Sequence, residues 1–90
     1  MTIRFYVSTT TKPMGLAKAI QGAMEEEPTV LLEAVGAGAI NQALKAVAAV
    51  NASIPESNMK YAVLPVMTVT QVNNSEKMRH MMKLTVKAIN

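Results

Sequence analysis

The fold of this chain is decided by residues 35–47, which read VGAGAINQALKAV. The short apolar run at residues 29–34 precedes this stretch and predicts a central, buried strand. Gly36 and Gly38 then allow a sharp turn, and the alanine-rich residues 39–52 predict a helix. The first N–H groups of such a helix have no intrahelical partner and lie at the positive end of its dipole, so this junction can receive a phosphate.

The glycine pattern differs from the common phosphate-binding motifs. Asn41 stands where a dinucleotide fingerprint has its third glycine, and no acidic residue follows on a next strand. The stretch is not a P-loop either. Two interpretations stay open: a tight turn that packs the helix close to the sheet, or a site where Asn41, Gln42 and Lys45 contact phosphate, sugar or base edges.

Outward from this junction, the N-terminal part of the chain predicts a strand and a helix. Residues 2–8 alternate between apolar and polar side chains and are rich in β-formers, as expected of a strand. Pro13 suits the first turn of a helix, and Pro28 ends it after the acidic residues 25–27. The acidic residues are interpreted as a solvated helix end, with a partner contact as the alternative.

Towards the C-terminus, residues 59–72 and 77–89 predict the two long strands of a hairpin, with a turn at residues 73–75. Pro65 has no N–H for the ladder, so it is expected at a bulge or at an edge position. The complete element order is βαβαββ.

Alternation along the last strand separates two faces. The face expected to join the core carries Met78, His80, Met82, Leu84, Val86 and Ala88. The opposite face carries the cations Lys77, Arg79, Lys83 and Lys87. These cations could follow a phosphate backbone, or they could be an ordinary solvated face whose lysines guard a sheet edge.

The apolar stripe of the second helix is predicted from Ile40, Leu44 and Val47. Ala49 and Ala52 continue the side of the helix that carries the polar residues, and a small-residue face also suits close contact between subunits. Half of the 90 residues are hydrophobic, and a single domain of this size is marginally stable alone. We therefore expect a homo-oligomer, a dimer or a tetramer, that buries apolar surface between its subunits.

The composition argues against several classes of function. The chain has no cysteine and no aspartate, and His80 is its one histidine, so the residues for a zinc or magnesium site or a catalytic triad are missing. We predict no metal, no cofactor and no enzymatic activity. No signal peptide or membrane span is evident, which predicts a cytoplasmic protein, with nucleoid association compatible. The net charge of +3 permits an anionic partner.

Residues 34–48 resemble the central signature of the stage V sporulation protein S (SpoVS) family. Leu64-Pro65 followed by Thr68 and Gln71, and then Lys83-Leu84, resembles the hairpin of the same family. The resemblance implies one SpoVS/Alba-like domain over residues 1–90. It also implies an α+β fold with two layers, in which a four-stranded mixed sheet carries two helices on one face.

Alba proteins bind nucleic acid through basic residues at the first loop, at the start of the second helix and on the hairpin arm. Thr11-Lys12-Pro13 resembles the entry to the first Alba helix, and Lys77 and Arg79 match the arm. The junction departs from Alba because it offers glycines and amides in place of basic side chains. The candidate nucleic-acid-binding residues are Lys12, Lys18, Gly36, Gly38, Asn41, Gln42, Lys45, Lys77, Arg79 and Lys83.

Three hypotheses about function follow. The first is a regulatory or architectural protein that binds DNA or RNA through phosphates, with little sequence preference, because only three aromatic residues are available for stacking. The second is a protein–protein assembly factor that does not touch nucleic acid. The third is a binder of a small nucleotide ligand at the Gly36–Gly38 junction.

Overall fold

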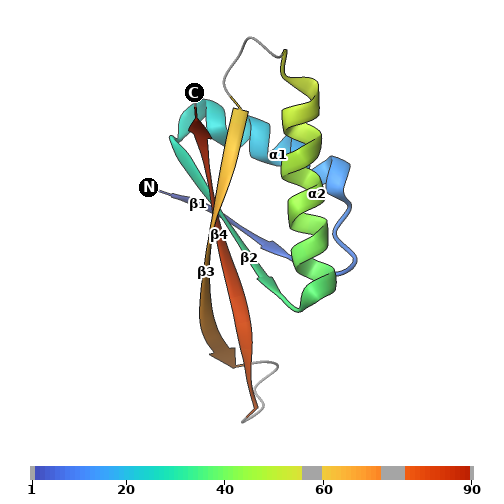
Figure 1. Cartoon of the computed structure of the whole chain (residues 1–90), viewed down its shortest axis with the longest axis vertical. Coiled ribbons are helices and arrows are strands. Elements are labelled where there is room, and N and C mark those ends of the chain that lie inside the picture. The colour runs from blue at the N-terminus through green and yellow to red at the C-terminus, as the bar shows by residue number, and fades with distance from the viewer. Residues whose placement is uncertain (1, 56–59, 72–76, 90) are drawn as a thin grey trace.

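The computed structural model describes residues 2–55, 60–71 and 77–89. They form six elements in the predicted order βαβαββ (Figure 1). Their bounds are β1 Ile3–Val7, α1 Pro13–Glu26, β2 Thr29–Val35, α2 Ala37–Ser53, β3 Lys60–Gln71 and β4 Met78–Ile89. The turn predicted at residues 73–75 lies outside the described residues.

The four strands form one mixed sheet in the order β1-β2-β4-β3. β1 is parallel to β2, whereas β4 runs antiparallel to both of its neighbours. The pairing of β3 with β4 runs without interruption from Lys60↔Ile89 to Gln71↔Met78. Pro65 therefore lies on an edge strand within a regular ladder, and of the two positions predicted for it the edge is correct.

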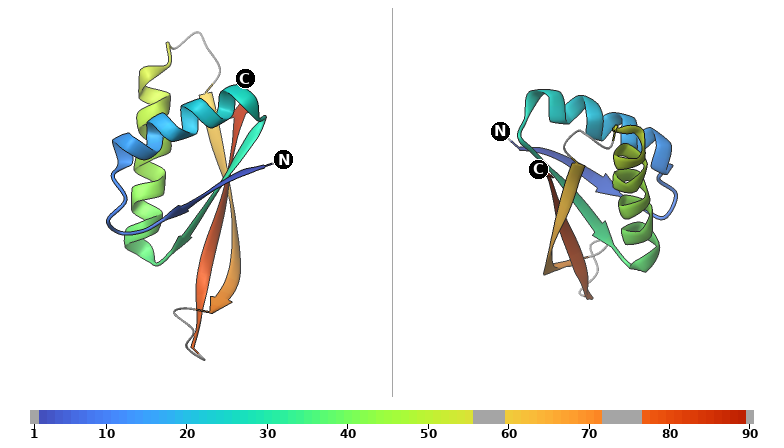
Figure 2. Two further views of the ribbon diagram at one scale, coloured as in Figure 1. Left: turned by 180° about the vertical axis from the view of Figure 1, so that it is seen from behind. Right: turned by 45° about the horizontal axis from the view of Figure 1, so that its top comes forward.

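Both helices cover the same face of the sheet, as the view from behind shows (Figure 2). The strands contribute buried side chains from β2 and β4, among them Val30, Leu32 and Val86, which are 0% exposed. Helix α1 contributes Ile20, which is also 0% exposed, and α2 contributes Val50 at 1%. Each such side chain stabilises the fold by about 1.5–3 kcal/mol relative to an exposed one. The core thus lies between one helical layer and one sheet layer, as predicted.

The core face of α2 is built mainly from alanine, which corrects the predicted stripe. Its buried residues are Ala39, Ala43, Ala46, Val47 and Val50. Ile40 is partly buried, whereas Leu44 is 46% exposed. Small side chains at this spacing let the helix backbone approach the sheet closely, and Leu44 lies outside this buried stripe on the solvent side of the helix.

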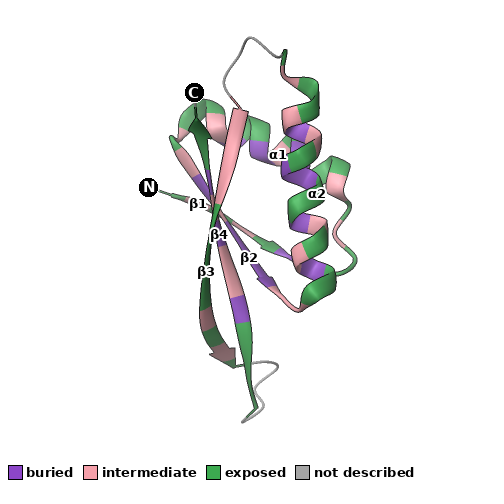
Figure 3. Ribbon diagram, viewed as in Figure 1, coloured by how far each residue is buried: buried purple, intermediate pink, exposed green. Residues whose placement is uncertain are grey.

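The hairpin of β3 and β4 extends beyond the two helices as an arm (Figures 1 and 2). Because neither α1 nor α2 covers the arm, Met78 and His80 are exposed, and their predicted place in the core is wrong. Leu84 and Val86, which lie under the helices, are buried as predicted (Figure 3). β4 is also an interior strand, so its lysines do not guard a sheet edge.

Within the described ranges, no helix is both long and apolar enough to cross a membrane.

Candidate functional site

The candidate site begins where β1 and β2 end. The two strands are parallel and pair Val7 with Ala34, so their carboxyl ends lie side by side at one edge of the sheet. The loop that leaves β1 and the glycine junction that leaves β2 are therefore neighbours. This places residues 8–12 beside the first turns of α2.

The loop after β1 is shaped by its own hydroxyl groups. The N–H of Ser8 donates to Oγ1 of Thr11 over 2.9 Å, and the N–H of Thr11 donates to the carbonyl oxygen of Ser8 over 3.2 Å. The hydroxyls of Ser8 and Thr10 are 3.0 Å apart. These bonds close a tight turn just before Lys12, whose backbone then begins α1.

Two contacts fix this loop to α2. Nε2 of Gln42 donates a hydrogen bond to the carbonyl oxygen of Thr11 over 2.9 Å. A β-carbon on Gly38 would lie 2.8 Å from Cγ2 of Thr9, so the loop packs into the space that this glycine leaves. Gln42, one of the candidate ligand contacts, thus holds the loop that carries Lys12.

The N-terminus of α2 presents free backbone donors. Gly36 is its N-cap residue, with a φ of 89°, a backbone conformation that strongly favours glycine. The first helical hydrogen bond runs from the N–H of Ile40 to the carbonyl oxygen of Gly36 over 3.1 Å. Among the described residues, no side chain caps this helix end, and its first turn holds no acidic residue, so the N–H groups of residues 37–39 point out of the helix end.

Arg79 brings the arm to the same place. β2 and β4 pair Val35 with Met81, so β4 passes the Gly36 turn at the level of Arg79. Nη2 of Arg79 lies 3.5 Å from the point that a β-carbon would occupy on Gly36. A guanidinium group therefore lies beside the uncapped helix end, where it adds a formal charge to the partial charges of the amides.

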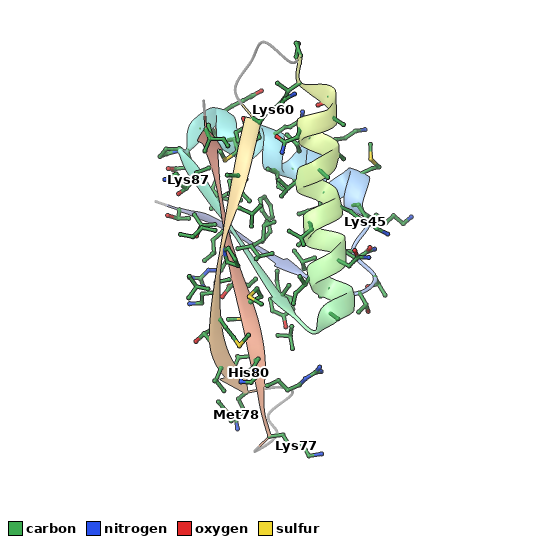
Figure 4. The ribbon with its side chains drawn as sticks, viewed as in Figure 1. Lys45, Lys60, Lys77, Met78, His80 and Lys87 are labelled. Atoms are coloured by element: carbon green, nitrogen blue, oxygen red, sulfur yellow. The ribbon has the colours of Figure 1, made fainter. Side chains whose placement is uncertain are left out.

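The remaining predicted residues divide into two groups: Asn41, Lys45 and Lys77 lie on α2 or at the end of the arm, whereas Lys18 and Lys83 lie away from the junction. Asn41 and Lys45 are exposed on α2, and Lys45 points away from the sheet (Figure 4). Lys77 lies at the described end of the arm, two residues from Arg79 (Figure 4). Lys18 and Lys83 lie elsewhere.

Lys18 is exposed on α1, beyond the loop. Lys83 pairs with Glu33 on the sheet face that no helix covers, and there Nε of Arg4 forms an ion pair with Oε1 of Glu33 over 3.1 Å. The structure thus brings together the β1–α1 loop, the glycine junction and Arg79, but not Lys18 or Lys83. For all ten candidate residues, contact with a ligand remains a prediction.

Sequence reasoning missed the residues that hold the site in shape. Thr9 and Thr11 position the loop, although only Lys12 was predicted from that segment. The signal was present, because four consecutive hydroxyl residues, Ser8 to Thr11, are typical of turns closed by side chains. Their partners on α2 depend on tertiary packing, which local pattern does not give.

The order of the elements, the mixed sheet and the loops that meet at the start of α2 define an Alba-like fold. In keeping with this, the chain is similar in structure to Alba from Thermoplasma volcanium, with a TM-score of 0.61 over 97% of this chain and 99% of that one. The two sequences are 12% identical, so this likeness concerns the fold. The chain belongs to the stage V sporulation protein S (SpoVS) family, whose model matches residues 4–89.

Proposed function

We propose that this protein binds nucleic acid through phosphate contacts with little sequence preference, as a regulatory or architectural protein. The observation that carries the proposal is the meeting of three segments that are distant in sequence. Lys12 on the β1–α1 loop, the uncapped start of α2 and Arg79 on the arm share one end of the sheet. We call this set the junction surface.

The chemistry of the junction surface suits a phosphodiester. A guanidinium group such as that of Arg79 can donate two parallel hydrogen bonds to phosphate oxygens, and a lysine adds a mobile point charge. Among the described residues, the glutamates are not free at this surface: Glu25 to Glu27 lie at the end of α1, and Glu33 is 8% exposed and forms an ion pair with Arg4. No described carboxylate therefore competes with a phosphate at this surface.

The placement of the aromatic residues supports weak sequence readout. Phe5 and Tyr61 pack against the hydrophobic core. Tyr6 is 69% exposed, but it is paired with Glu33 in the sheet and lies on the face without helices. Tyr6 is therefore the single exposed aromatic side chain among the described residues, so base stacking would be limited and phosphate contacts would dominate the affinity.

A salt titration of binding to duplex DNA, single-stranded DNA and RNA tests the proposal. Removing two charges in Lys12→Gln/Arg79→Gln should flatten the slope of log K against log salt by about 0.7–0.9 per lost contact. Lys87→Gln is a matched control for the loss of one charge, because Lys87 is exposed at the opposite end of the sheet (Figure 4). Its slope should equal that of the wild type.

Two results would overturn the proposal. One is the absence of wild-type binding to all three nucleic acids at low salt, which would favour an assembly factor. The other is an equal slope for the double variant and the wild type. A mononucleotide that competes at micromolar concentration and withstands moderate salt would indicate a small-ligand site next to Arg79 in place of a nucleic-acid surface.

A further inference from the structure

The sheet face that neither α1 nor α2 covers carries a row of side chains with mixed chemistry (Figure 2). Leu32 is buried under the helices, so the next residue on β2, Glu33, faces the opposite way, and so does its partner Lys83. Strand pairing places Tyr6 beside Glu33, and Val66 beside Lys83. The row therefore crosses all four strands, from one edge of the sheet to the other.

Large side chains are exposed at both ends of this row. Tyr6, on the edge strand β1, is 69% exposed. On the other edge strand, β3, Val66 is 54% exposed, and Leu64 on the same face is 59% exposed. An exposed aromatic ring is a surface on which an unpaired base can stack, and the two aliphatic side chains offer further apolar contact.

The charge of the row is positive. Glu33 is only 8% exposed, and its Oε1 lies 3.1 Å from Nε of Arg4, so this carboxylate already has a partner. Lys83 lies on the other side of Glu33 and adds a second cation. One carboxylate between two cations leaves a net positive charge, which complements a phosphate. We call Tyr6, Leu64, Val66 and Lys83 the open-face patch.

The open-face patch is continuous with the junction surface along β4. Side chains two residues apart on a strand share a face, so Met81 lies between Arg79 and Lys83. Met81 is 9% exposed, and its partner Val35 on β2 is half-buried. Arg79 and Lys83 are about 13 Å apart at about 3.3 Å per residue. A nucleic acid bound at Arg79 can thus cross an apolar floor to reach Lys83 and Tyr6.

We propose that the open-face patch binds single-stranded nucleic acid that continues from the junction surface. Lys83 contacts a phosphate, and one base stacks on the ring of Tyr6. The occupant is single-stranded because the bases of a duplex are paired and stacked on one another, so they cannot lie on a side-chain ring. The positive charge and the continuity with the junction surface favour a nucleic acid over a protein partner. This inference rests on the proposed function.

Tyr6→Ala tests the stacking contact with a single strand and a duplex of equal length. Loss of the ring should weaken single-strand binding about fivefold or more, because stacking on an aromatic side chain contributes at least about that factor. The affinity for the duplex should stay that of the wild type. Tyr6→Phe keeps the ring and should bind the single strand as the wild type does. Because the Tyr6 side chain lies largely in water, both variants should fold.

Lys83→Gln tests the phosphate contact by its salt dependence. The slope of log K against log salt should flatten by about 0.7 for the single strand and stay unchanged for the duplex. Lys87→Gln is the matched control, because Lys87 lies on the same face of β4 but beyond the patch, and it should keep the wild-type slope. Tyr6→Ala should lower log K at every salt concentration without changing the slope, since stacking releases no counterions.

Tyrosine fluorescence gives a readout in a protein that keeps the whole patch. The chain has two tyrosines and no tryptophan, so Tyr61→Phe leaves Tyr6 as the single emitter. Tyr61 packs against the core, and phenylalanine keeps its ring there. Single-stranded oligo-dT should quench this emission when a base stacks on Tyr6, whereas a duplex should not.

The outcomes separate this inference from the proposed function. If the wild type binds nucleic acid but Tyr6→Ala binds the single strand equally well, or oligo-dT leaves the emission of Tyr6 unchanged, the inference is wrong and the proposed function stands. Equal losses of single-strand and duplex affinity in Tyr6→Ala would also overturn it. Absence of wild-type binding to both nucleic acids at low salt would overturn the proposed function as well.

Discussion

Gly38 has no room for a side chain, because the methyl group of Thr9 lies where its β-carbon would be. The two positions are 2.8 Å apart, which is closer than carbon atoms pack. Glycine is otherwise a poor choice in a helix, since it costs about 0.8–1.0 kcal/mol relative to alanine. Its presence at the start of α2 is therefore explained by the packing of the loop that carries Lys12.

This contact predicts that the effect of Gly38→Ala depends on residue 9. In the wild type, overpacking against Thr9 opposes the gain in helix propensity, and we expect a net loss of about 1 kcal/mol in the free energy of unfolding. In a Thr9→Ala background the methyl group is gone, and the same change should stabilise by up to about 1 kcal/mol. Urea denaturation of the four proteins measures both values.

Gly22→Ala provides the control for helix propensity. Nothing lies within 4 Å of the β-carbon that this substitution adds to α1, so it should stabilise both backgrounds equally. If Gly38→Ala changed the stability by the same amount with threonine and with alanine at position 9, the contact would have no energetic role.

At the scale of elements, the end of α2 is held to the start of β3 by two side chains. The amide of Asn51 bonds both backbone groups of Tyr61, as a neighbouring strand would. Nζ of Lys60 donates to the carbonyl oxygens of Asn51 and Ile54 over 3.0 Å and 2.6 Å. A cation at a helix C-terminus also interacts favourably with the helix dipole.

We expect Asn51→Ala to destabilise the protein by about 1–3 kcal/mol, because it leaves a half-buried N–H and C=O without partners. Asn41→Ala is the matched control, since Asn41 is exposed on the same helix and its side chain makes no hydrogen bond to the described residues. That change should be within about 0.5 kcal/mol of neutral. Thermal or urea unfolding measures the stability of both variants. Equal losses of stability in the two variants would contradict the role of Asn51.

The type and order of the elements were predictable because each has a clear local signal. Pro13 starts α1, the glycines separate β2 from α2, and the apolar alternation of β3 and β4 indicates strands. The predictions that were wrong concern the exposure of particular residues. His80 alternates in phase with Leu84 and was therefore predicted in the core. It is exposed because β4 extends beyond the part of the sheet that α1 and α2 cover. The periodicity of β4 does not indicate where the helices end.

At the scale of the whole molecule, the site depends on strand order and register. The resemblance to Alba predicted Lys12, the glycine junction and Arg79 as parts of one surface. The contact of Arg79 with Gly36 follows from the pairing of Val35 with Met81, which the sequence does not specify. Strand order likewise placed the lysines of β4 inside the sheet and left β3, which is uncharged from Tyr61 to Gln71, at an edge.

Helix α1 separates the basic residue Lys12 at its start from the acidic residues Glu25 and Glu26 at its end. The helix has 14 residues, so about 21 Å separates its start next to Lys12 from its acidic end. This distance exceeds the Debye length of about 10 Å at 0.1 M salt but not that of about 30 Å at 0.01 M. Glu25 and Glu26 should therefore influence an anion at the junction surface only when the salt concentration is low.

Glu25→Gln/Glu26→Gln raises the net charge from +3 to +5 without touching the junction surface. At 0.01 M salt the variant should bind nucleic acid about two- to threefold more tightly than the wild type, through the long-range field. At 0.1 M and above the two affinities should coincide, so the curves of log K against log salt should converge. This outcome differs from that of Lys12→Gln/Arg79→Gln, which should lower the affinity and flatten the slope. A variant that stays tighter by the same factor up to 0.2 M would show that the acidic end of α1 lies against the bound nucleic acid, and the binding surface would then have to extend along the whole helix.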